Sequence, residues 1–262
     1  MIKMCFPHLF SQMAESKQSG KLTSGDQQMR AQAAVVFLVD VDNTLLNNDR
    51  IQEDLKRHIE RKFGREYRDR FWAIQEKLFE ELGYRDYLGA LQRFRVENPY
   101  EPHLVTAATF LVDYPFANRL YPEALDVLEQ LRQWGQTVIL SDGDVVFQPR
   151  KVERSGIFEA VDGHVLIYIH KEESLEDVVR RYPAEHYVMV DDKLRILTDI
   201  KKYWGDRVTT VFPRQGQFAY DPQVLASYPA ADITVDRIGD LLEMDLANLL
   251  ESRQPTQPTG GA

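Results

Sequence analysis

Residues 35–46 read VVFLVDVDNTLL. The first five are apolar and mostly β-branched, which is typical of a strand buried on both faces of a parallel sheet. The run continues into Asp40 and Asp42, and parallel sheets place their ligands at the carboxyl ends of the strands. If the chain turns there, both carboxylates can aim at one point, where like charges need a cation or a proton between them. A plainer reading remains open, in which the acids cap the strand and Asn43 and Thr44 begin a helix.

Further apolar runs along the chain predict more strands, and helical patterns separate them. The strands are expected at residues 137–140, 165–169, 187–190 and 208–212, with a short one at 233–235. A helix is expected between Pro122 and Gly135, and a last helix through residue 250. Strands that alternate with helices form parallel sheets with helices on both faces. The predicted fold is therefore α/β, a doubly wound parallel sheet of Rossmann-like type.

The block between the first two strands carries a helical pattern instead. From residue 51 to 111, apolar residues recur every three or four positions, and Gly64 and Gly83 interrupt the run. We expect an inserted all-helical cap domain. The expected domain plan is an N-terminal extension at 1–33, a core at 34–46 and 119–250, the cap at 47–118, and a tail at 251–262.

Composition limits the possible functions. The chain has 262 residues and a formal net charge of -9, which is unfavourable for binding nucleic acid or an anionic membrane. Its single cysteine, Cys5, excludes a disulfide framework within the chain and a cysteine metal site. No apolar run approaches the roughly 20 residues that a membrane-spanning helix needs, and the N-terminus lacks the continuous apolar stretch of a signal peptide. We therefore expect a cytoplasmic protein, monomeric or homodimeric.

Polar residues follow four of the expected strands, and in a parallel sheet these ends share one edge. They are Asp40 and Asp42, Ser141 and Asp142, Lys171, and Asp191 and Asp192. Clustered carboxylates suit Mg²⁺, a hard cation that often accompanies phosphate substrates. A lysine and a hydroxyl can hold a phosphoryl group, one carboxylate can act as nucleophile, and another can exchange protons. Taken singly, each could instead be a turn residue, a surface lysine or a helix cap.

The four motifs together resemble the haloacid dehalogenase-like superfamily. The stretch from Asp40 to Thr44 matches its Asp-x-Asp-x-Thr motif, and Ser141 matches its Ser/Thr motif. Lys171 is the best match to the lysine motif, although Lys151 and Lys193 are also near in sequence. The pair 191–192 matches the acidic motif. The similarity spans about residues 34–250.

The resemblance implies a role for each matched residue. Asp40 would be the nucleophile, Asp42 the general acid/base, and Thr44 a brace for the first loop. Ser141, Asp142 and Lys171 would bind the phosphoryl group. Mg²⁺ would be held by Asp40, by Asp42 through its main-chain carbonyl, and by the pair Asp191 and Asp192. The expected activity is Mg²⁺-dependent hydrolysis of a small phosphorylated metabolite through an aspartyl phosphate.

Four alternatives compete with this expectation. Metal-free dehalogenases of the superfamily typically lack the second acid, so Asp42 argues against that chemistry. A phosphomutase would keep all four motifs and stays open. A receiver domain of a signalling protein places its acidic pair before the phosphorylated Asp, the reverse of the order here. A non-catalytic phosphate-binding module would not need intact acids at every motif. Substrate contacts could come from the cap at 84–87 and from the loop at Arg214, although packing within the cap and a solvated loop arginine are the plainer readings.

Overall fold

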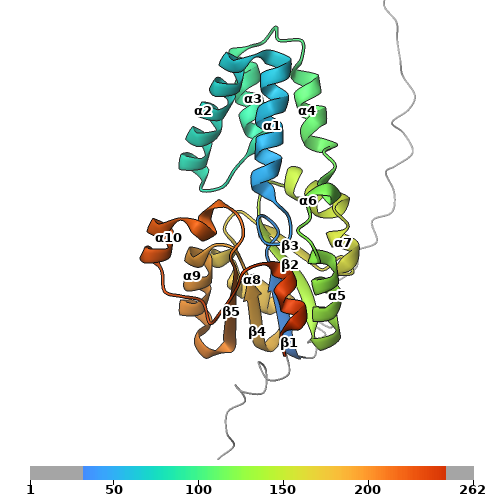
Figure 1. Ribbon diagram of the computed structural model, residues 1–262, viewed down its shortest axis with the longest axis vertical. Coiled ribbons are helices and arrows are strands. Elements are labelled where there is room, and N and C mark those ends of the chain that lie inside the picture. The colour runs from blue at the N-terminus through green and yellow to red at the C-terminus, as the bar shows by residue number, and fades with distance from the viewer. Residues whose placement is uncertain (1–31, 246–262) are drawn as a thin grey trace, which may run out of the picture. The chain divides into compact units, whose positions relative to one another are not determined.

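The computed structural model describes residues 32–245. They are built on a six-stranded sheet in the order β3-β2-β1-β4-β5-β6, in which every neighbouring pair is parallel (Figure 1). The strands are β1 (Ala33–Val39), β2 (Gln136–Asp142), β3 (Val165–Tyr168), β4 (Ala184–Val190), β5 (Val208–Pro213) and β6 (Ile233–Val235). The parallel α/β sheet is confirmed, including its short sixth strand.

β1 lies inside the sheet and is buried on both faces, as its sequence predicts. Phe37 and Val39 belong to one apolar cluster, and Val36 and Leu38 belong to a second. Helix α5 (Ala124–Trp134) packs into the first cluster, and α8 (Leu175–Arg181) and α9 (Leu194–Trp204) pack into the second. Each fully buried side chain of this size stabilises the fold by about 1.5–3 kcal/mol. Helices therefore cover both faces, which is the doubly wound arrangement.

Short helices complete the connections. They are α6 (Phe147–Arg154), α7 (Ile157–Ala160) and α10 (Pro222–Ser227), with the 3-10 helices η1 (Phe116–Arg119), η2 (Lys171–Glu173), η3 (Gly205–Arg207), η4 (Gln217–Tyr220) and η5 (Ile238–Glu243). α6 and η2 directly follow β2 and β3, so they lie at the edge of the sheet where the predicted site residues gather.

Four helices lie between β1 and the return of the chain to the sheet. They are α1 (Asn48–Phe63), α2 (Arg65–Leu82), α3 (Tyr87–Glu97) and α4 (Leu104–Val112), drawn from blue to green in Figure 1. Aromatic rings hold them together: Phe94 of α3 contacts Phe63 of α1 and Phe71 of α2 at centroid distances of 6.2 and 6.1 Å. Residues 48–112 contain no strand. The helical character of the block follows the prediction, while the cap boundaries 47–118 stay a prediction.

The two linkers of this helical block run side by side. The N–H of Asn47 donates to the carbonyl of Arg119 at 2.7 Å, and Leu46 and Leu120 form an antiparallel bridge. One residue further, the N–H of Tyr121 donates to the carbonyl of Leu45 at 2.9 Å. The chain therefore leaves the core and re-enters it at one hydrogen-bonded point.

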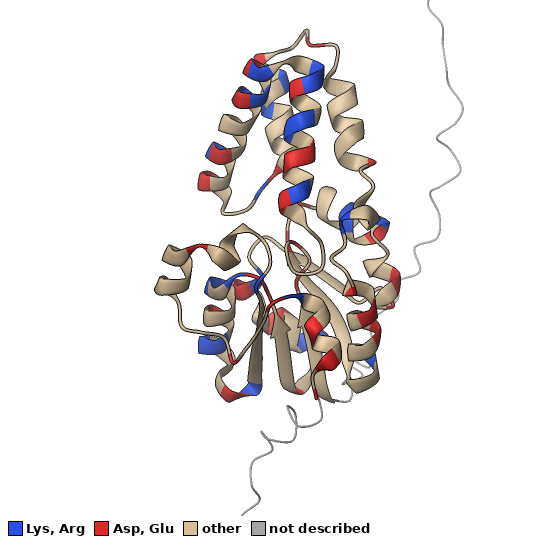
Figure 2. Ribbon diagram, in the orientation of Figure 1, with Lys and Arg blue, Asp and Glu red and all other residues tan. Residues whose placement is uncertain are grey.

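Lys and Arg positions lie among Asp and Glu positions along α1 and α2 (Figure 2). Two ion pairs join α2 to α3: Arg70 with Glu97 at 2.5 Å and Arg93 with Glu81 at 2.8 Å. Exposed pairs of this kind contribute only about 0–1 kcal/mol each. Between residues 32 and 245, no helix is both long and apolar enough to span a bilayer.

The structure departs from the sequence prediction in a few places. β1 begins at Ala33, one residue inside the segment assigned to the N-terminal extension, because Ala33 pairs with Ala184 of β4. Pro122 does not begin a helix: α5 starts at Ala124, after Glu123 in a left-handed conformation (φ 65°). The expected last helix is the 3-10 helix η5 as far as Glu243. Met244 and Asp245 are described and are not helical, whereas residues 246–250, the tail and residues 1–31 of the extension lie outside the described residues.

Candidate active site

The loop after β1 turns back on itself and gives its two acids different surroundings. The N–H of Asp40 still donates to a carbonyl of β4 at 2.9 Å, so Asp40 continues the sheet. The N–H groups of residues 44–46 then all donate to the carbonyl of Val41. Asn43 takes a left-handed conformation (φ 61°) that an asparagine tolerates better than most residues. This turn, rather than an extended strand or the first turn of a helix, sets the direction of Asp42.

The Asp42 carboxylate is not part of the group of acids that converges around Asp40, so the possible meeting of both carboxylates at one point is not realised. The Lys171 ammonium lies 2.5 Å from Asp40 Oδ1, whereas the Lys151 ammonium lies 2.5 Å from Asp42 Oδ1. Each acid thus has its own cation.

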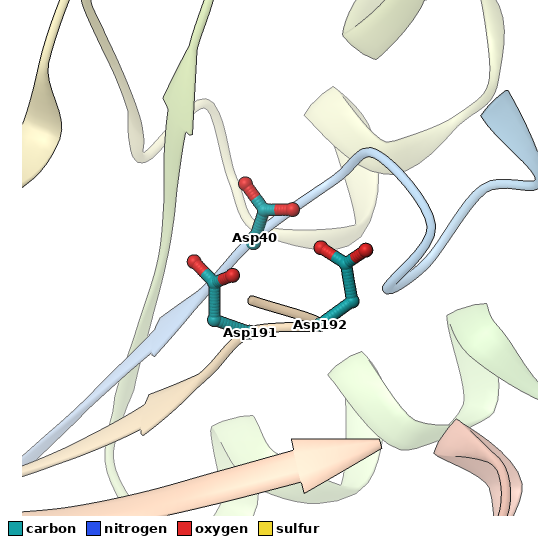
Figure 3. Close-up of side chains that lie close together, drawn as sticks. All are labelled: Asp40, Asp191 and Asp192. Atoms are coloured by element: carbon teal, nitrogen blue, oxygen red, sulfur yellow. The ribbon is translucent and has the colours of Figure 1, made fainter. Parts of the chain in front are cut away.

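Three other carboxylates do converge. One oxygen each from Asp40, Asp191 and Asp192 lies within 4.8 Å of the others, and all three residues are buried. Figure 3 shows Asp40 following β1 and the acidic pair following β4, with their carboxylates gathered at the ends of these neighbouring strands. The N–H of Asp191 donates to the carbonyl of Val211 at 3.1 Å, which anchors the pair to β5.

Lys171 supplies a positive charge inside this cluster. Its ammonium lies 2.5 Å from Asp40 Oδ1 and 2.6 Å from Asp191 Oδ2, and it donates to the carbonyl of Leu140 at 3.2 Å. The side chain is fully buried. Burial alone would lower the pKa of Lys171, but the carboxylates of Asp191 and Asp40 raise it well above its usual value. The ammonium therefore stays protonated at neutral pH.

The acid cluster fits a bound cation. Burial raises the pKa of Asp191 to about 6 and raises that of Asp192 well above its usual value, with Lys193 opposing the rise at Asp192. Asp40 Oδ2 and both oxygens of Asp192 are buried without a hydrogen-bond donor. Buried carboxylates in this state require a proton or a metal ion. Oxygen ligands of this charge suit Mg²⁺.

The other predicted site residues support this cluster. The Asp192 N–H donates to the Thr44 hydroxyl at 3.1 Å, so Thr44 braces the first loop against the acidic pair. Asp142 Oδ1 accepts the Lys171 N–H at 2.8 Å, which fixes the turn that carries the lysine. Ser141 is buried, and its hydroxyl accepts from the Gln148 amide at 2.9 Å. Burial raises the pKa of Asp142.

A cavity of about 540 Å³ opens between these loops and the helical block. Its core side includes Asp42, Asp142 and Lys193, and its cap side includes Asn48 and Gln52 of α1. Tyr84, Arg85 and Tyr87, which belong to the predicted contact segment 84–87, also line it. Asp86 instead caps α3 by accepting the Gly89 N–H at 2.7 Å. Arg214 is not among the lining residues and lies 3.7 Å from Asp236.

Three polar residues that line this cavity were not predicted as site residues from the sequence. Asn48 and Gln148 line the cavity, and Lys151 was considered only as an alternative phosphate lysine. Lys151 and Gln148 lie three residues apart on α6, so they share a face of that helix. The amphipathic pattern of α6, which follows the Ser141 strand, is the signal that could have placed both beside the site.

Residues 35–197 match the protein family described as haloacid dehalogenase-like hydrolase. A solved structure described as a haloacid dehalogenase-like hydrolase from Burkholderia xenovorans LB400 is 61% identical, with a TM-score of 0.78. That match covers 80% of this chain and 98% of the other. No curated protein matches the chain significantly.

Two more distant structures share the fold. The hydrolase YfnB from Bacillus subtilis, bound to magnesium, is 15% identical with a TM-score of 0.53, over 81% of this chain and 98% of that one. An L-2-haloacid dehalogenase from Xanthobacter autotrophicus, with chloropropionic acid covalently bound, is 19% identical with a TM-score of 0.52. That match covers 79% of this chain and 96% of the dehalogenase chain. At these identities the likeness concerns the fold alone.

Proposed function

Because the chain belongs to the haloacid dehalogenase-like hydrolase family, we propose that it is a Mg²⁺-dependent phosphatase for a small phosphate ester. One observation carries the proposal. Asp40 has one oxygen paired with the Lys171 ammonium and the other unpartnered, within a cluster of buried acids that suits a cation.

In the first step, a carboxylate oxygen of Asp40 attacks phosphorus and forms an aspartyl phosphate. The bond between phosphorus and the ester oxygen breaks, and the leaving oxygen takes a proton from the Asp42 carboxyl group. Lys171 holds the Asp40 carboxylate and offers positive charge near the phosphoryl oxygens. The turn of residues 44–46 keeps Asp42 directed into the cavity, where a leaving group can reach it.

In the second step, Asp42 is a carboxylate and acts as a base. It removes a proton from a water molecule, whose oxygen attacks the phosphorus of the aspartyl phosphate. Inorganic phosphate leaves and the Asp40 carboxylate is restored, so Asp42 ends the cycle protonated again. One group thus serves both proton transfers.

Asp40, Asp191 and Asp192 would hold Mg²⁺, which when bound supplies positive charge against the repulsion between these acids and an incoming phosphate. The chain's own contribution is to fix the carboxylates at the sheet edge and to cover them. The cavity between core and cap has room for a small metabolite, and its walls limit contact with bulk water.

The test is phosphate release from a panel of phosphate monoesters by the full chain with Mg²⁺. EDTA should abolish turnover, and added Mg²⁺ should restore it. Asp40→Asn should leave almost no activity, and Asp42→Asn should lose roughly 10²–10⁴-fold. Asp206→Asn is the matched control, because Asp206 is exposed in η3 at the opposite, amino-terminal edge of the sheet.

Two results would contradict the proposal. Full activity in EDTA would remove the metal from the mechanism. Chloride release from 2-chloropropionate, with no phosphate released from any ester, would indicate dehalogenation instead.

A further inference from the structure

A second buried lysine stands beside the proposed acid/base. The Lys151 ammonium lies 2.5 Å from Asp42 Oδ1 and donates to Asn48 Oδ1 at 3.2 Å. It also lies 5.1 Å from the ring centroid of Phe147. Only 1% of the Lys151 side chain is exposed, against 24% of the Asp42 side chain. The lysine is therefore part of the wall, and the acid faces the cavity.

Burying an ammonium costs several kcal/mol unless an anion and further acceptors compensate it. Asp42 and Asn48 supply that compensation, and the Phe147 ring adds a cation–π contact. The same contacts restrain the acid. Without Lys151, the partly exposed Asp42 carboxylate would lose the ammonium that contacts its Oδ1 atom. The Lys171 ammonium already contacts two other acids, Asp40 and Asp191.

The contacts of Lys151 also cross from the core to the helical block. Lys151 belongs to α6, Asp42 to the loop after β1, and Asn48 is the first residue of α1. One ammonium thus joins the acid to the end of the cap helix that lies nearest the core.

We propose that Lys151 is a positioning residue. It holds the Asp42 carboxyl group, which is protonated before the first step and a carboxylate before the second, where it can exchange a proton with the leaving oxygen. Through Asn48 it links this placement to the first turn of α1. The proposal rests on the phosphatase function proposed above. It assigns Lys151 no contact with the substrate.

The first experiment compares leaving groups. An aryl phosphate such as p-nitrophenyl phosphate leaves without help from an acid, whereas an alkyl phosphate needs one. The value of kcat/KM reports the step that releases the alcohol. Lys151→Met should lower kcat/KM for alkyl phosphates by roughly 10²-fold, the scale of one general-acid contribution, and for the aryl ester by less than about 10-fold. Arg154→Met, which removes an exposed charge from the same helix, is the matched control and should leave both unchanged.

The second experiment asks whether Lys151 acts through Asp42. In an Asp42→Asn background, Lys151→Met should change alkyl turnover by less than about 2-fold, because the group that it positions is gone. Losses that multiply would mean that Lys151 acts on its own and would overturn the proposal. Equal losses on aryl and alkyl esters would do the same.

A third measurement needs neither metal nor substrate. Asp42→Asn leaves the buried Lys151 ammonium without its carboxylate partner. In EDTA, this substitution should therefore lower the melting temperature clearly in the wild-type background and little in the Lys151→Met background. Equal shifts in the two backgrounds would contradict the contact. If Lys151→Met does not fold, Asn48→Ala removes only the second acceptor and should shift the aryl-to-alkyl ratio in the same direction, by less. An unchanged ratio in that variant would overturn the link to α1.

The outcomes separate the two proposals. A wild-type chain that hydrolyses no phosphate ester overturns the proposed function and the positioning role with it. An active wild type with multiplying losses overturns the positioning role alone.

Discussion

The Thr44 hydroxyl accepts a hydrogen bond from the main-chain N–H of Asp192 at 3.1 Å, although the two residues are 148 positions apart in the chain. Both are buried, and the Thr44 carbonyl accepts a further bond from the Gln215 amide at 2.8 Å. This contact sets the spacing between the loop that carries Asp40 and the pair that would share a metal ion with it.

Thr44→Val should therefore loosen the site as well as the fold. The substitution leaves the buried Asp192 N–H without an acceptor, which costs about 1–3 kcal/mol of unfolding free energy. Mg²⁺ should bind more weakly, because the acidic pair loses its brace. Urea unfolding and a Mg²⁺ titration measure the two effects. Thr44→Ser keeps the hydroxyl and should behave nearly as wild type; equal losses in both variants would assign the effect to packing.

Lys171→Ala should weaken binding of vanadate, a phosphate mimic, roughly 10- to 100-fold, as expected for the loss of a hydrogen bond between charged groups. The protein should also become less stable in EDTA, since Asp40 and Asp191 lose the cation between them. Added Mg²⁺ should recover part of that stability by binding the folded state. If Lys193→Ala abolishes vanadate binding and Lys171→Ala does not, the phosphate lysine is wrongly assigned.

Gly83→Ala should disturb the contact between cap and core. Gly83 has a left-handed backbone (φ 77°), and an added Cβ would lie 2.7 Å from the ring atom Cε1 of His170, the residue before Lys171. Gly156 is the matched control, because it has a similar backbone (φ 84°) and its nearest neighbour would be 3.8 Å away. Both variants should lose about 1–2 kcal/mol to the left-handed backbone. Only Gly83→Ala should also raise KM, measured by steady-state kinetics.

The stability of the folded protein should depend on pH through Asp54, which lies in α1 near the linkers of the helical block. It accepts from the Tyr114 hydroxyl at 2.5 Å and from Arg119 Nη2 at 2.6 Å, which ties α1 to the returning linker. Burial opposes ionisation, but the hydrogen bonds from Tyr114 and Arg119 lower the pKa of Asp54 overall. A lowered folded pKa means that the stabilisation is complete above the unfolded pKa of about 3.9 and is lost as pH falls through the folded value.

Asp54→Asn should therefore destabilise the protein at pH 7 by about 1–2 kcal/mol and have little effect at low pH, where Asp54 is already protonated. Denaturant unfolding of both proteins across this range measures the difference. A destabilisation that is the same at every pH would show that the charge of Asp54 plays no part.

The sequence predicted the sheet well because buried parallel strands have a strong signature. The run from Val35 to Val39 alternates between the two apolar clusters, so both of its faces had to be apolar. The helical block was equally clear from its four-residue repeat. Helix starts were less certain: Pro122 is well suited to a first turn, yet the chain enters α5 only after the left-handed residue Glu123.

Within the site, the sequence indicated which residue types would meet but not how they would pair. Lys171 was identified because it follows a strand, and its contacts with Asp40 and Asp191 agree with that choice. The Lys151 side chain extends from α6 to Asp42, and this contact depends on which face of α6 is turned toward the loop after β1. The different surroundings of Asp40 and Asp42 depend on the tight turn in which residues 44–46 donate to the carbonyl of Val41. The two-residue spacing of the acids in the sequence does not reveal this turn.

The paired linkers bear on how this architecture tolerates change. Because the Asn47 N–H donates to the Arg119 carbonyl, the two ends of the helical block are held together where they join the core. The entropy cost of closing a loop grows only slowly with its length, by about 0.6 kcal/mol per doubling. Helices can thus be lengthened, shortened or exchanged in this block while the strand order beneath it stays the same. Under the proposed function, substrate preference would change with the block while Asp40 and the acidic pair keep their places at the ends of the strands.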